Sequence, residues 1–210
     1  LLFVVLFVFC ISSVAAAGPT IDRILKNGVL VVGTSGEFPP FTAKTKDGKP
    51  MGLDMDLAAA IAISMGVQVK FETMPFEKLI PALEAGKIDI ILSCMTMSTE
   101  RNLKMAFVGP YFISGQALLA RKETALSLNS PADINKADFS IAVEKGTTSE
   151  QIAKTIAPKA KITVAKDMDS ALNLLYKKKV KAVMCDYPLA KVMAFRNQDK
   201  GLVSTDRFSY

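Results

Sequence analysis

Hydrophobic residues in this chain gather in short runs that alternate with stretches of helical periodicity. The first clear run, Val29 to Val32, is apolar and β-branched and ends at Gly33, which is typical of a buried parallel strand. The elements predicted in this half, strand and helix in alternation, are 29–32, 54–65, 67–71, 76–85 and 88–92. Gly66 and Gly86 follow the two helices and are suited to end them. This order predicts a parallel sheet with helices on its faces.

The same alternation restarts after a longer extended segment over 112–122, which indicates a crossing into a second unit. The elements predicted there are 139–143, 147–158, 161–165, 169–178, 180–185 and 187–195. Thr148 and Gln151 have the spacing of a capping box at the start of the first of these helices. We therefore expect an α/β protein of two lobes, each a small, mostly parallel sheet flanked by helices, with a ligand cleft between the lobes.

Polar residues follow the carboxyl ends of the predicted strands, where ligands bind in open α/β sheets. These positions are 35–41, 93–101, 146–148 and 186. The segment Ser93 to Arg101 is unusual, because four hydroxyl residues are followed by an arginine. One interpretation is a helix start, since Ser and Thr cap helices, and the other is a socket for a small anion. An acid and a helix start from the second lobe complete the set, which favours the socket.

Composition narrows the function classes. Of the 210 residues, 50% are hydrophobic and 22% are charged, so a packed core is expected rather than disorder. The formal charge of +6 comes from scattered lysines, and the one cluster, Lys177 to Lys181, reads as a solvated helix end. No nucleic-acid-binding module is visible. The chain has no histidine, which removes the common catalytic triads and the usual zinc sites, so we expect no catalytic residues, no metal and no cofactor.

The first seventeen residues read as a secretory signal. The apolar run from Leu1 to Ile11 is too short to span a bilayer, and cleavage is expected after Ala17. Because the sequence begins with Leu and lacks a positive n-region, we expect that it starts inside the signal. Cys10 lacks the small residues that lipidation needs before it. The mature protein is therefore expected to be exported, periplasmic and soluble.

Two cysteines remain after the signal, Cys94 and Cys185. Export makes a disulfide chemically feasible. They belong to different lobes, each at a strand end that faces the cleft, so a fixed bridge would obstruct ligand exchange. We therefore expect no permanent disulfide between them.

Six ordered segments, which lie between positions 36 and 190, resemble a known family. They are GEFPPF (36–41), GLDMDLA (52–58), LIPALEAGKID (79–89), MTMSTERNLKMAFVGPY (95–111), VEKGTT (143–148) and KAVMCDYPLA (181–190). The chain is similar to the periplasmic amino-acid-binding proteins of ABC importers, the family-3 solute-binding proteins. This resemblance implies a monomer that captures a free polar amino acid by hinge closure. It would deliver this ligand to the membrane permease of an ABC importer without making or breaking a bond. Glu144, at a position that the family uses to meet the ligand side chain, and Glu37, next to Phe38, favour a ligand of cationic or amide type.

The resemblance also implies a domain plan. Its parts are a signal peptide at 1–17, a first lobe at 18–112, a hinge crossing at 113–120, a second lobe at 121–205 and the start of a return hinge at 206–210. Members of the family continue beyond this point and finish on the first lobe. The C-terminal return to the first lobe is therefore expected to be missing from this sequence.

Ligand contacts also follow from the resemblance. Arg101 would hold the α-carboxylate, Asp186 the α-ammonium, and Thr96 both ends of the head group. The further predicted contacts are Ser35, Phe38, Phe76, Ser93, Cys94 with its backbone, Glu144 and Thr148. Each has a structural alternative: Arg101 as a surface salt bridge, the phenylalanines as core, and Asp186 or Thr148 as a helix cap. Asp54 and Asp56 are interpreted as the acidic start of a helix rather than as a catalytic pair.

Two alternative functions stay open at this point. A few relatives on this fold are periplasmic dehydratases, and an acid such as Glu144 keeps that chemistry open, although the chain lacks histidine. The same two-lobed module also serves as the ligand-binding sensor domain of receptors and kinases.

Overall fold

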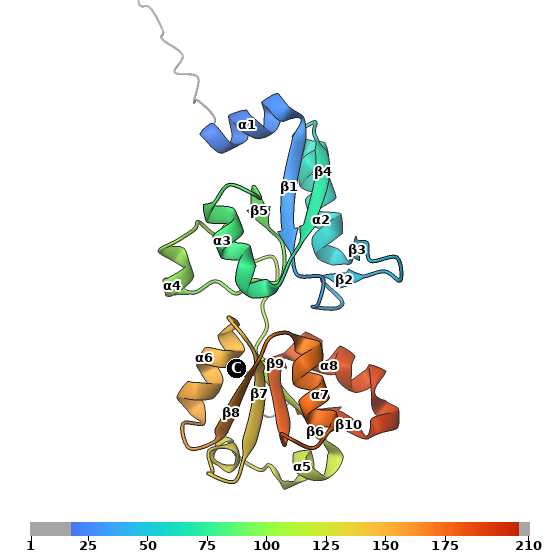
Figure 1. Cartoon of the computed structure of the whole chain (residues 1–210), viewed down its shortest axis with the longest axis vertical. Helices are drawn as coiled ribbons and strands as arrows, with labels where there is room; N and C mark the ends of the chain where they lie inside the picture. Colours follow the sequence, from blue (N-terminus) through green and yellow to red (C-terminus); the bar gives the residue numbers. More distant parts are fainter. Residues whose placement is uncertain (1–17, 206–210) are drawn as a thin grey trace, which may run out of the picture.

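The structure is a computed structural model that describes residues 18–205, so the predicted signal peptide at 1–17 and the segment 206–210 lie outside the described residues. Two α/β lobes lie one above the other along the long axis of the molecule, as Figure 1 shows. One chain segment without regular structure, which ends at Gly115, leads from the first lobe into the second. Within the described residues, no helix is long and apolar enough to cross a membrane.

The first lobe is built on a three-stranded sheet of order β4-β1-β5, and all its pairs are parallel. Its elements are α1 (Pro19–Asn27), β1 (Val29–Thr34), β2 (Ala43–Lys44), β3 (Pro50–Met51), α2 (Leu53–Ser64), β4 (Gln68–Thr73), η1 (Phe76–Lys78), α3 (Leu79–Glu84), β5 (Ile90–Ile91) and α4 (Thr99–Asn102). Leu30 and Val32 pack with α2, whereas Val31 packs with α3. The alternation of side chains along β1 therefore places one helix on each face of the sheet.

Gly33 does not end the first strand, contrary to the sequence-based expectation. Strand β1 continues through Thr34, which pairs with Thr73. A Cβ atom at Gly33 would collide with the side chain of Ile88 and crowd Leu79. The glycine therefore allows close packing between β1 and the α3 side of the lobe rather than breaking the strand.

The second lobe carries a five-stranded sheet of order β10-β6-β9-β7-β8. Its elements are β6 (Gln116–Arg121), α5 (Lys122–Ser127), η2 (Pro131–Ile134), β7 (Ser140–Glu144), α6 (Thr148–Ile156), β8 (Lys161–Ala165), α7 (Met168–Tyr176), β9 (Ala182–Asp186), α8 (Tyr187–Arg196), η3 (Gln198–Lys200) and β10 (Leu202–Ser204). Strand β7 pairs in parallel with β8 and β9, but β6 is antiparallel to both β9 and β10. The sheet is mixed, so the expectation of a mostly parallel sheet holds only for its β8-β7-β9 part.

The predicted crossing over 113–120 overlaps strand β6, which begins at Gln116. Gln116 pairs with Asp186 in the second-lobe sheet. By its hydrogen bonds β6 thus belongs to the second lobe, and the chain enters that lobe from its cleft end. This entry direction explains why β6 runs against β9.

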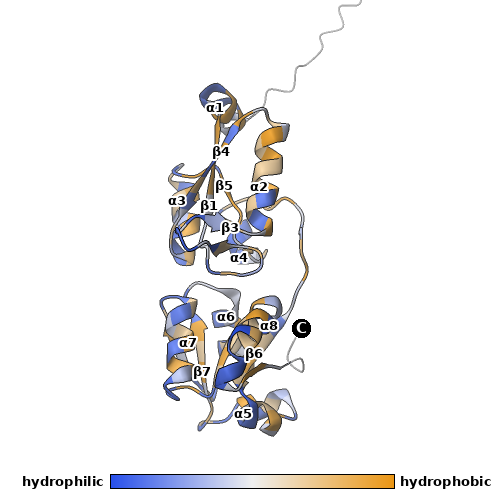
Figure 2. Cartoon of the chain, turned by 90° about the vertical axis from the view of Figure 1, so that its right-hand side faces the viewer, coloured by the Kyte–Doolittle hydropathy of each residue, from blue (hydrophilic) through white to orange (hydrophobic). Residues whose placement is uncertain are grey.

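Hydrophobic packing separates the two lobes into independent cores. In Figure 2, α2 is coloured as hydrophobic along most of its length, with hydrophilic residues at its lower end, toward the second lobe. The second-lobe sheet has a buried cluster on each face, one with α7 and α8 and the other with α6. Each lobe therefore buries most of its own apolar residues. Phe38 of the first lobe packs against the cluster of α7 and α8, and polar, aromatic and aliphatic side chains share the region between the lobes.

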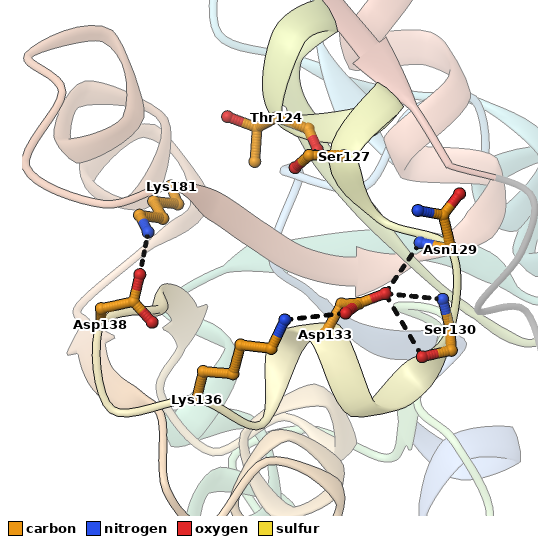
Figure 3. Close-up of polar contacts among 8 residues, drawn as sticks. All are labelled: Thr124, Ser127, Asn129, Ser130, Asp133, Lys136, Asp138 and Lys181. Carbon is orange, nitrogen blue, oxygen red and sulfur yellow. Dashed lines mark hydrogen bonds and ion pairs between the residues drawn. The ribbon is translucent and has the colours of Figure 1, made fainter.

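The end of the second lobe that lies away from the first lobe carries a set of paired charges, drawn in Figure 3. Asp133 accepts hydrogen bonds from the backbone N–H groups of Asn129 (2.9 Å) and Ser130 (3.0 Å) and from Lys136 Nζ (2.8 Å). Lys181 Nζ lies 2.9 Å from Asp138. Each of these two carboxylates thus has a lysine beside it; Asp133 lies within the short η2 turn and Asp138 lies after its end.

Candidate functional site

One pocket between the lobes collects most of the predicted site residues. Nine of the ten line it: Ser35, Phe38, Phe76, Cys94, Thr96 and Arg101 from the first lobe, and Glu144, Thr148 and Asp186 from the second. The tenth, Ser93, lies behind the lining. Its Oγ accepts the backbone N–H of Ser35 (3.0 Å) and donates to Ser35 Oγ (3.1 Å), so it holds Ser35 in place.

Arg101 belongs both to a helix start and to the pocket lining, so the helix start is confirmed and the anion socket stays a prediction. The Ser98 side chain accepts the Arg101 backbone N–H (3.3 Å) and caps the short helix α4. The Arg101 side chain turns into the pocket, where it is only 8% exposed. It donates to the carbonyl oxygens of Thr96 (2.7 Å) and Gly146 (2.9 Å), and its guanidinium carbon lies 5.5 Å from the centre of the Phe76 ring. A guanidinium has five N–H donors, so further donors remain for an anion in the pocket.

Polar contacts between the lobes surround this pocket. Besides the bond from Arg101 to Gly146, Thr148 Oγ1 lies 3.3 Å from Thr96 Oγ1, and Gln151 donates to Glu100 (2.9 Å). Lys145 forms an ion pair with Glu77 at 2.8 Å. The lobes therefore meet at the rim of the pocket, and residues of both are within reach of one small ligand.

Asp186 lies at the carboxyl end of β9. It occupies the N-cap position of α8, but its side chain makes no capping hydrogen bond. Instead Asp186 Oδ1 accepts from Gln116 Nε2 (2.7 Å), and Gln116 Oε1 accepts from Ser149 Oγ (2.5 Å). Burial raises the pKa of Asp186 to about 6, while the hydrogen bond from Gln116 and the charge of Arg101 oppose the rise. The pairing of β6 with β9 brings Gln116 to this place, and no local sequence pattern signals it.

Glu144, at the end of β7, is 7% exposed and lines the same pocket. Burial and the nearby carboxylates of Glu37, Asp167 and Asp186 raise the pKa of Glu144 to about 8. Glu37 comes from the first lobe, so acids of both lobes face each other here. The Glu37 pKa is also raised, first by burial, although Lys44 lies 4.0 Å away. This part of the pocket therefore favours a positive charge, which would relieve the repulsion between the acids.

Thr147, and not Thr148, caps helix α6. Thr147 Oγ1 accepts the backbone N–H of Glu150 (3.3 Å), whereas Thr148 is the first helical residue. The predicted capping box was shifted by one position, because the sequence offers two adjacent threonines. The Thr148 hydroxyl is thus directed to the pocket and to Thr96.

The Cys94 backbone differs from its predicted role. Its N–H donates to Asp54 Oδ2 (3.1 Å) and lies 3.2 Å from Tyr111 Oη, so this amide is already occupied and does not face a ligand. Cys94 and Cys185 both line the pocket as free thiols. Within the described residues, no group of three or more His, Cys, Asp or Glu side chains is arranged to hold a metal ion.

Two α/β lobes with a polar pocket between them define the class of two-lobed binding proteins that close around a small ligand. More particularly, the chain belongs to the bacterial extracellular solute-binding proteins, family 3, which match residues 30–203. The resemblance drawn from the six segments is therefore confirmed.

Relatives and solved structures agree with this membership. The chain is 35% identical to a protein of Campylobacter jejuni named "Probable histidine-binding protein", over 81% of this chain and 64% of the relative. It is 31% identical to the glutamine-binding protein of Geobacillus stearothermophilus, over 78% of this chain and 63% of the relative. Among solved structures, an ancestral arginine-binding protein bound to glutamine has 38% identity and a TM-score of 0.81, covering 87% of this chain and 80% of that chain. The chain spans less than two thirds of the length of these two curated relatives.

Proposed function

We propose that this chain is the ligand-binding part of an exported protein that captures a free amino acid and passes it to the permease of an ABC importer. The observation that carries the proposal is that Arg101 of one lobe and Asp186 of the other line the same pocket. An α-amino acid carries both a carboxylate and an ammonium group. A cation on one lobe and an anion on the other satisfy both groups only when the lobes are together, which couples binding to hinge closure.

We further propose that the ligand side chain is cationic or carries an amide. The acids Glu37 and Glu144 support this, since a half-buried and a buried carboxylate that repel each other gain from a positive charge or a hydrogen-bond donor. Phe38 and Phe76 offer aromatic faces to a cation in the same pocket. Relatives named for arginine and glutamine, and a solved structure of a Wolinella succinogenes protein with lysine, are consistent with this class. Ser35 weighs against it, because the family resemblance implies an acid at that position in members that bind cations.

A thermal-shift screen of the twenty amino acids tests the proposal. A ligand at 100 times its dissociation constant stabilises the folded protein by about 2.7 kcal/mol. We expect arginine, lysine, histidine or glutamine to give the largest shifts. If no amino acid shifts the midpoint, the binding function is wrong. Larger shifts with leucine or phenylalanine would contradict the proposed side-chain class alone.

One observation favours a second candidate function, a dehydratase. Glu144 is buried in the pocket and its raised pKa of about 8 is suited to a general acid. A relative of Pseudomonas aeruginosa, 27% identical over 83% of this chain, is a cyclohexadienyl dehydratase. Incubation with a cyclohexadienyl substrate and detection of the aromatic product decide this point. We expect no turnover, whereas turnover that Glu144→Gln abolishes would establish the enzyme.

A further inference from the structure

Cys94 adopts a backbone conformation that non-glycine residues rarely use. Its φ angle is +49°, in the left-handed region. For a residue with a Cβ atom this conformation costs about 1–2 kcal/mol, so surrounding interactions must hold it. The turn redirects the chain from β5 toward Thr96, whose carbonyl oxygen in turn accepts from Arg101. The shape of this turn therefore sets where the arginine lies.

Asp54 supplies the interaction that holds the turn. It lies in the first turn of α2, is fully buried, and accepts the Cys94 N–H through Oδ2 at 3.1 Å. A carboxylate is a stronger acceptor than a neutral oxygen, and the start of a helix favours its charge. Burial raises the pKa of Asp54, and within the described part of the chain its Oδ1 has no hydrogen-bond partner. Such a buried carboxylate is costly, which indicates a role beyond starting the helix.

Tyr111 joins the same group from the segment that leads to the second lobe. Its hydroxyl oxygen lies 3.2 Å from the Cys94 nitrogen, and a hydrogen bond from Tyr111 opposes the rise in the Asp54 pKa. Four residues further on, the Gly115 carbonyl accepts the Tyr187 N–H at the start of α8 (2.9 Å). The next residue, Gln116, donates to Asp186. The short stretch from Tyr111 to Gln116 thus connects the Cys94 turn with Gln116, the hydrogen-bond partner of Asp186.

We propose that Asp54 and Tyr111 are positioning residues that hold the Cys94 turn. They link the segment that carries Arg101 to the chain segment that connects the lobes. Asp54 lines no part of the ligand pocket, and Tyr111 lines only the wider cavity that adjoins it, so each acts through Cys94. This inference rests on the proposed function, since it explains how the arginine is kept in a geometry suited to a carboxylate. It also gives a physical reason for the first acid of the GLDMDLA segment, which the sequence alone presents only as a helix start.

The test uses Asp54→Asn, which removes the charge but keeps an oxygen, and Tyr111→Phe, which removes only the hydroxyl. Asp56→Asn, an exposed acid in the same turn, is the matched control. Titration calorimetry with the amino acid that stabilises the wild type most should give roughly tenfold weaker binding for Asp54→Asn and about threefold for Tyr111→Phe. The control should bind as the wild type does. Unchanged affinity in both variants would overturn the inference.

A double-mutant cycle separates positioning from a general loss of stability. Glycine adopts the left-handed conformation without a penalty, so in a Cys94→Gly background Asp54→Asn should weaken binding no more than about twofold. An equally large effect in both backgrounds would mean that Asp54 serves only the core, which would contradict the proposal.

Hydrogen exchange of the ligand-free protein gives an outcome that is independent of binding. The Cys94 amide should exchange at least about tenfold faster in Asp54→Asn and in Tyr111→Phe, with the later turns of α2 unchanged. If the wild type binds no amino acid, the proposed function fails, but this measurement still tests whether Asp54 and Tyr111 hold the Cys94 turn. Equal exchange rates in all three proteins would overturn it.

Discussion

The second lobe carries acidic residues at both of its ends, and the pKa values of the two groups are shifted in opposite directions. At the far end, Asp133 and Asp138 each lie beside a lysine, and these contacts lower the pKa of both carboxyls. At the cleft end, burial raises the pKa of Glu144 to about 8 and that of Asp186 to about 6. Asp138 is exposed, Asp133 is half-buried and both have partners, whereas Glu144 is buried among other acids and Asp186 lies near Arg101.

This contrast distinguishes acids that stabilise the fold from acids that are suited to bind a ligand. A carboxylate with its own lysine needs nothing more, and its contribution to stability at the surface is small. A buried carboxyl such as that of Glu144, whose charged neighbours are other acids, is costly to ionise, so a positively charged group that enters the pocket is strongly favoured. We therefore expect substitutions at the cleft end to change binding and those at the far end to change only stability.

The largest effect is expected for Arg101 and Asp186, the proposed contacts of the carboxylate and the ammonium group of the ligand. Arg101→Met and Asp186→Asn should each weaken amino-acid binding by roughly 2–5 kcal/mol, because the partner charge on the ligand is left desolvated and unpaired. Titration calorimetry measures this loss, and Arg196→Met, which removes an exposed arginine of α8, is the matched control. Affinity close to that of the wild type in Arg101→Met would mean that the 93–101 segment is only a helix start.

The next effect concerns protons at Glu144. Because its pKa is about 8, Glu144 is mostly protonated at neutral pH, and a cationic ligand should expel that proton. Below this pKa, affinity for a cationic ligand should rise about tenfold per pH unit. Calorimetry at pH 7 in buffers of different ionisation enthalpy should detect release of up to one proton in the wild type and none in Glu144→Gln. Equal proton release by both proteins would disprove the assignment.

The same group makes the ligand-free protein sensitive to pH in the opposite direction. The Glu144 pKa is raised above its ordinary value of 4.5, so the folded protein holds more protons than the unfolded one between these values. Stability contributed by this group is present below pH 4.5 and is lost as the pH rises toward 8. Thermal midpoints measured over this range should fall with pH in the wild type and fall less in Glu144→Gln.

A smaller effect is expected from the adjacent threonines of α6. Thr147→Ala removes the helix cap and should lower the free energy of unfolding by about 1 kcal/mol. Thr148→Val keeps the cap but removes the hydroxyl that faces Thr96, so it should weaken ligand binding more than it lowers stability. Urea unfolding and calorimetry on both variants check this division. If Thr147→Ala mainly weakened binding and Thr148→Val mainly lowered stability, Thr148 would be the helix cap instead.

The smallest effect is expected at the far end. Hydrogen bonds from Lys136 and from the Asn129 and Ser130 amides lower the Asp133 pKa below its ordinary value of 3.8. The stabilisation is therefore present above pH 3.8 and is lost as the pH falls through the lowered value. Asp133→Asn should lower the thermal midpoint slightly at pH 7 and less at the most acidic pH that leaves the protein folded, with no change in ligand affinity. A change in affinity would break the comparison between the two ends.

Local patterns predicted much of this molecule. The apolar runs predicted β1, β4, β7, β8 and β9 to within one or two residues at most of their ends. A buried strand can be recognised in this way because its own side chains are apolar. Helix α1 was not predicted, although Pro19 at its first position is a usable signal. The family resemblance also located nine residues of the pocket lining, of which six lie within the six segments and Ser35, Phe76 and Cys94 lie outside them.

Non-local contacts explain what the sequence could not predict. The mixed second sheet depends on β6 pairing against β9, and that pairing also brings Gln116 to Asp186. The role of Asp54 depends on an amide forty positions away in the chain. The hydrogen bond from Arg101 to the Gly146 carbonyl oxygen likewise depends on contact between the lobes. None of these pairings leaves a periodic or compositional mark on its own segment.

The central claim is that one lobe holds the carboxylate of an amino acid and the other holds its ammonium group. The most direct test is a calorimetric comparison of the tightest-binding amino acid with the amine that lacks its carboxylate, on the wild type and on Arg101→Met. The wild type should prefer the amino acid by about 100-fold or more, and Arg101→Met should reduce this preference to a few-fold. A wild type that binds both compounds equally, or an Arg101→Met variant that keeps the full preference, would contradict the account.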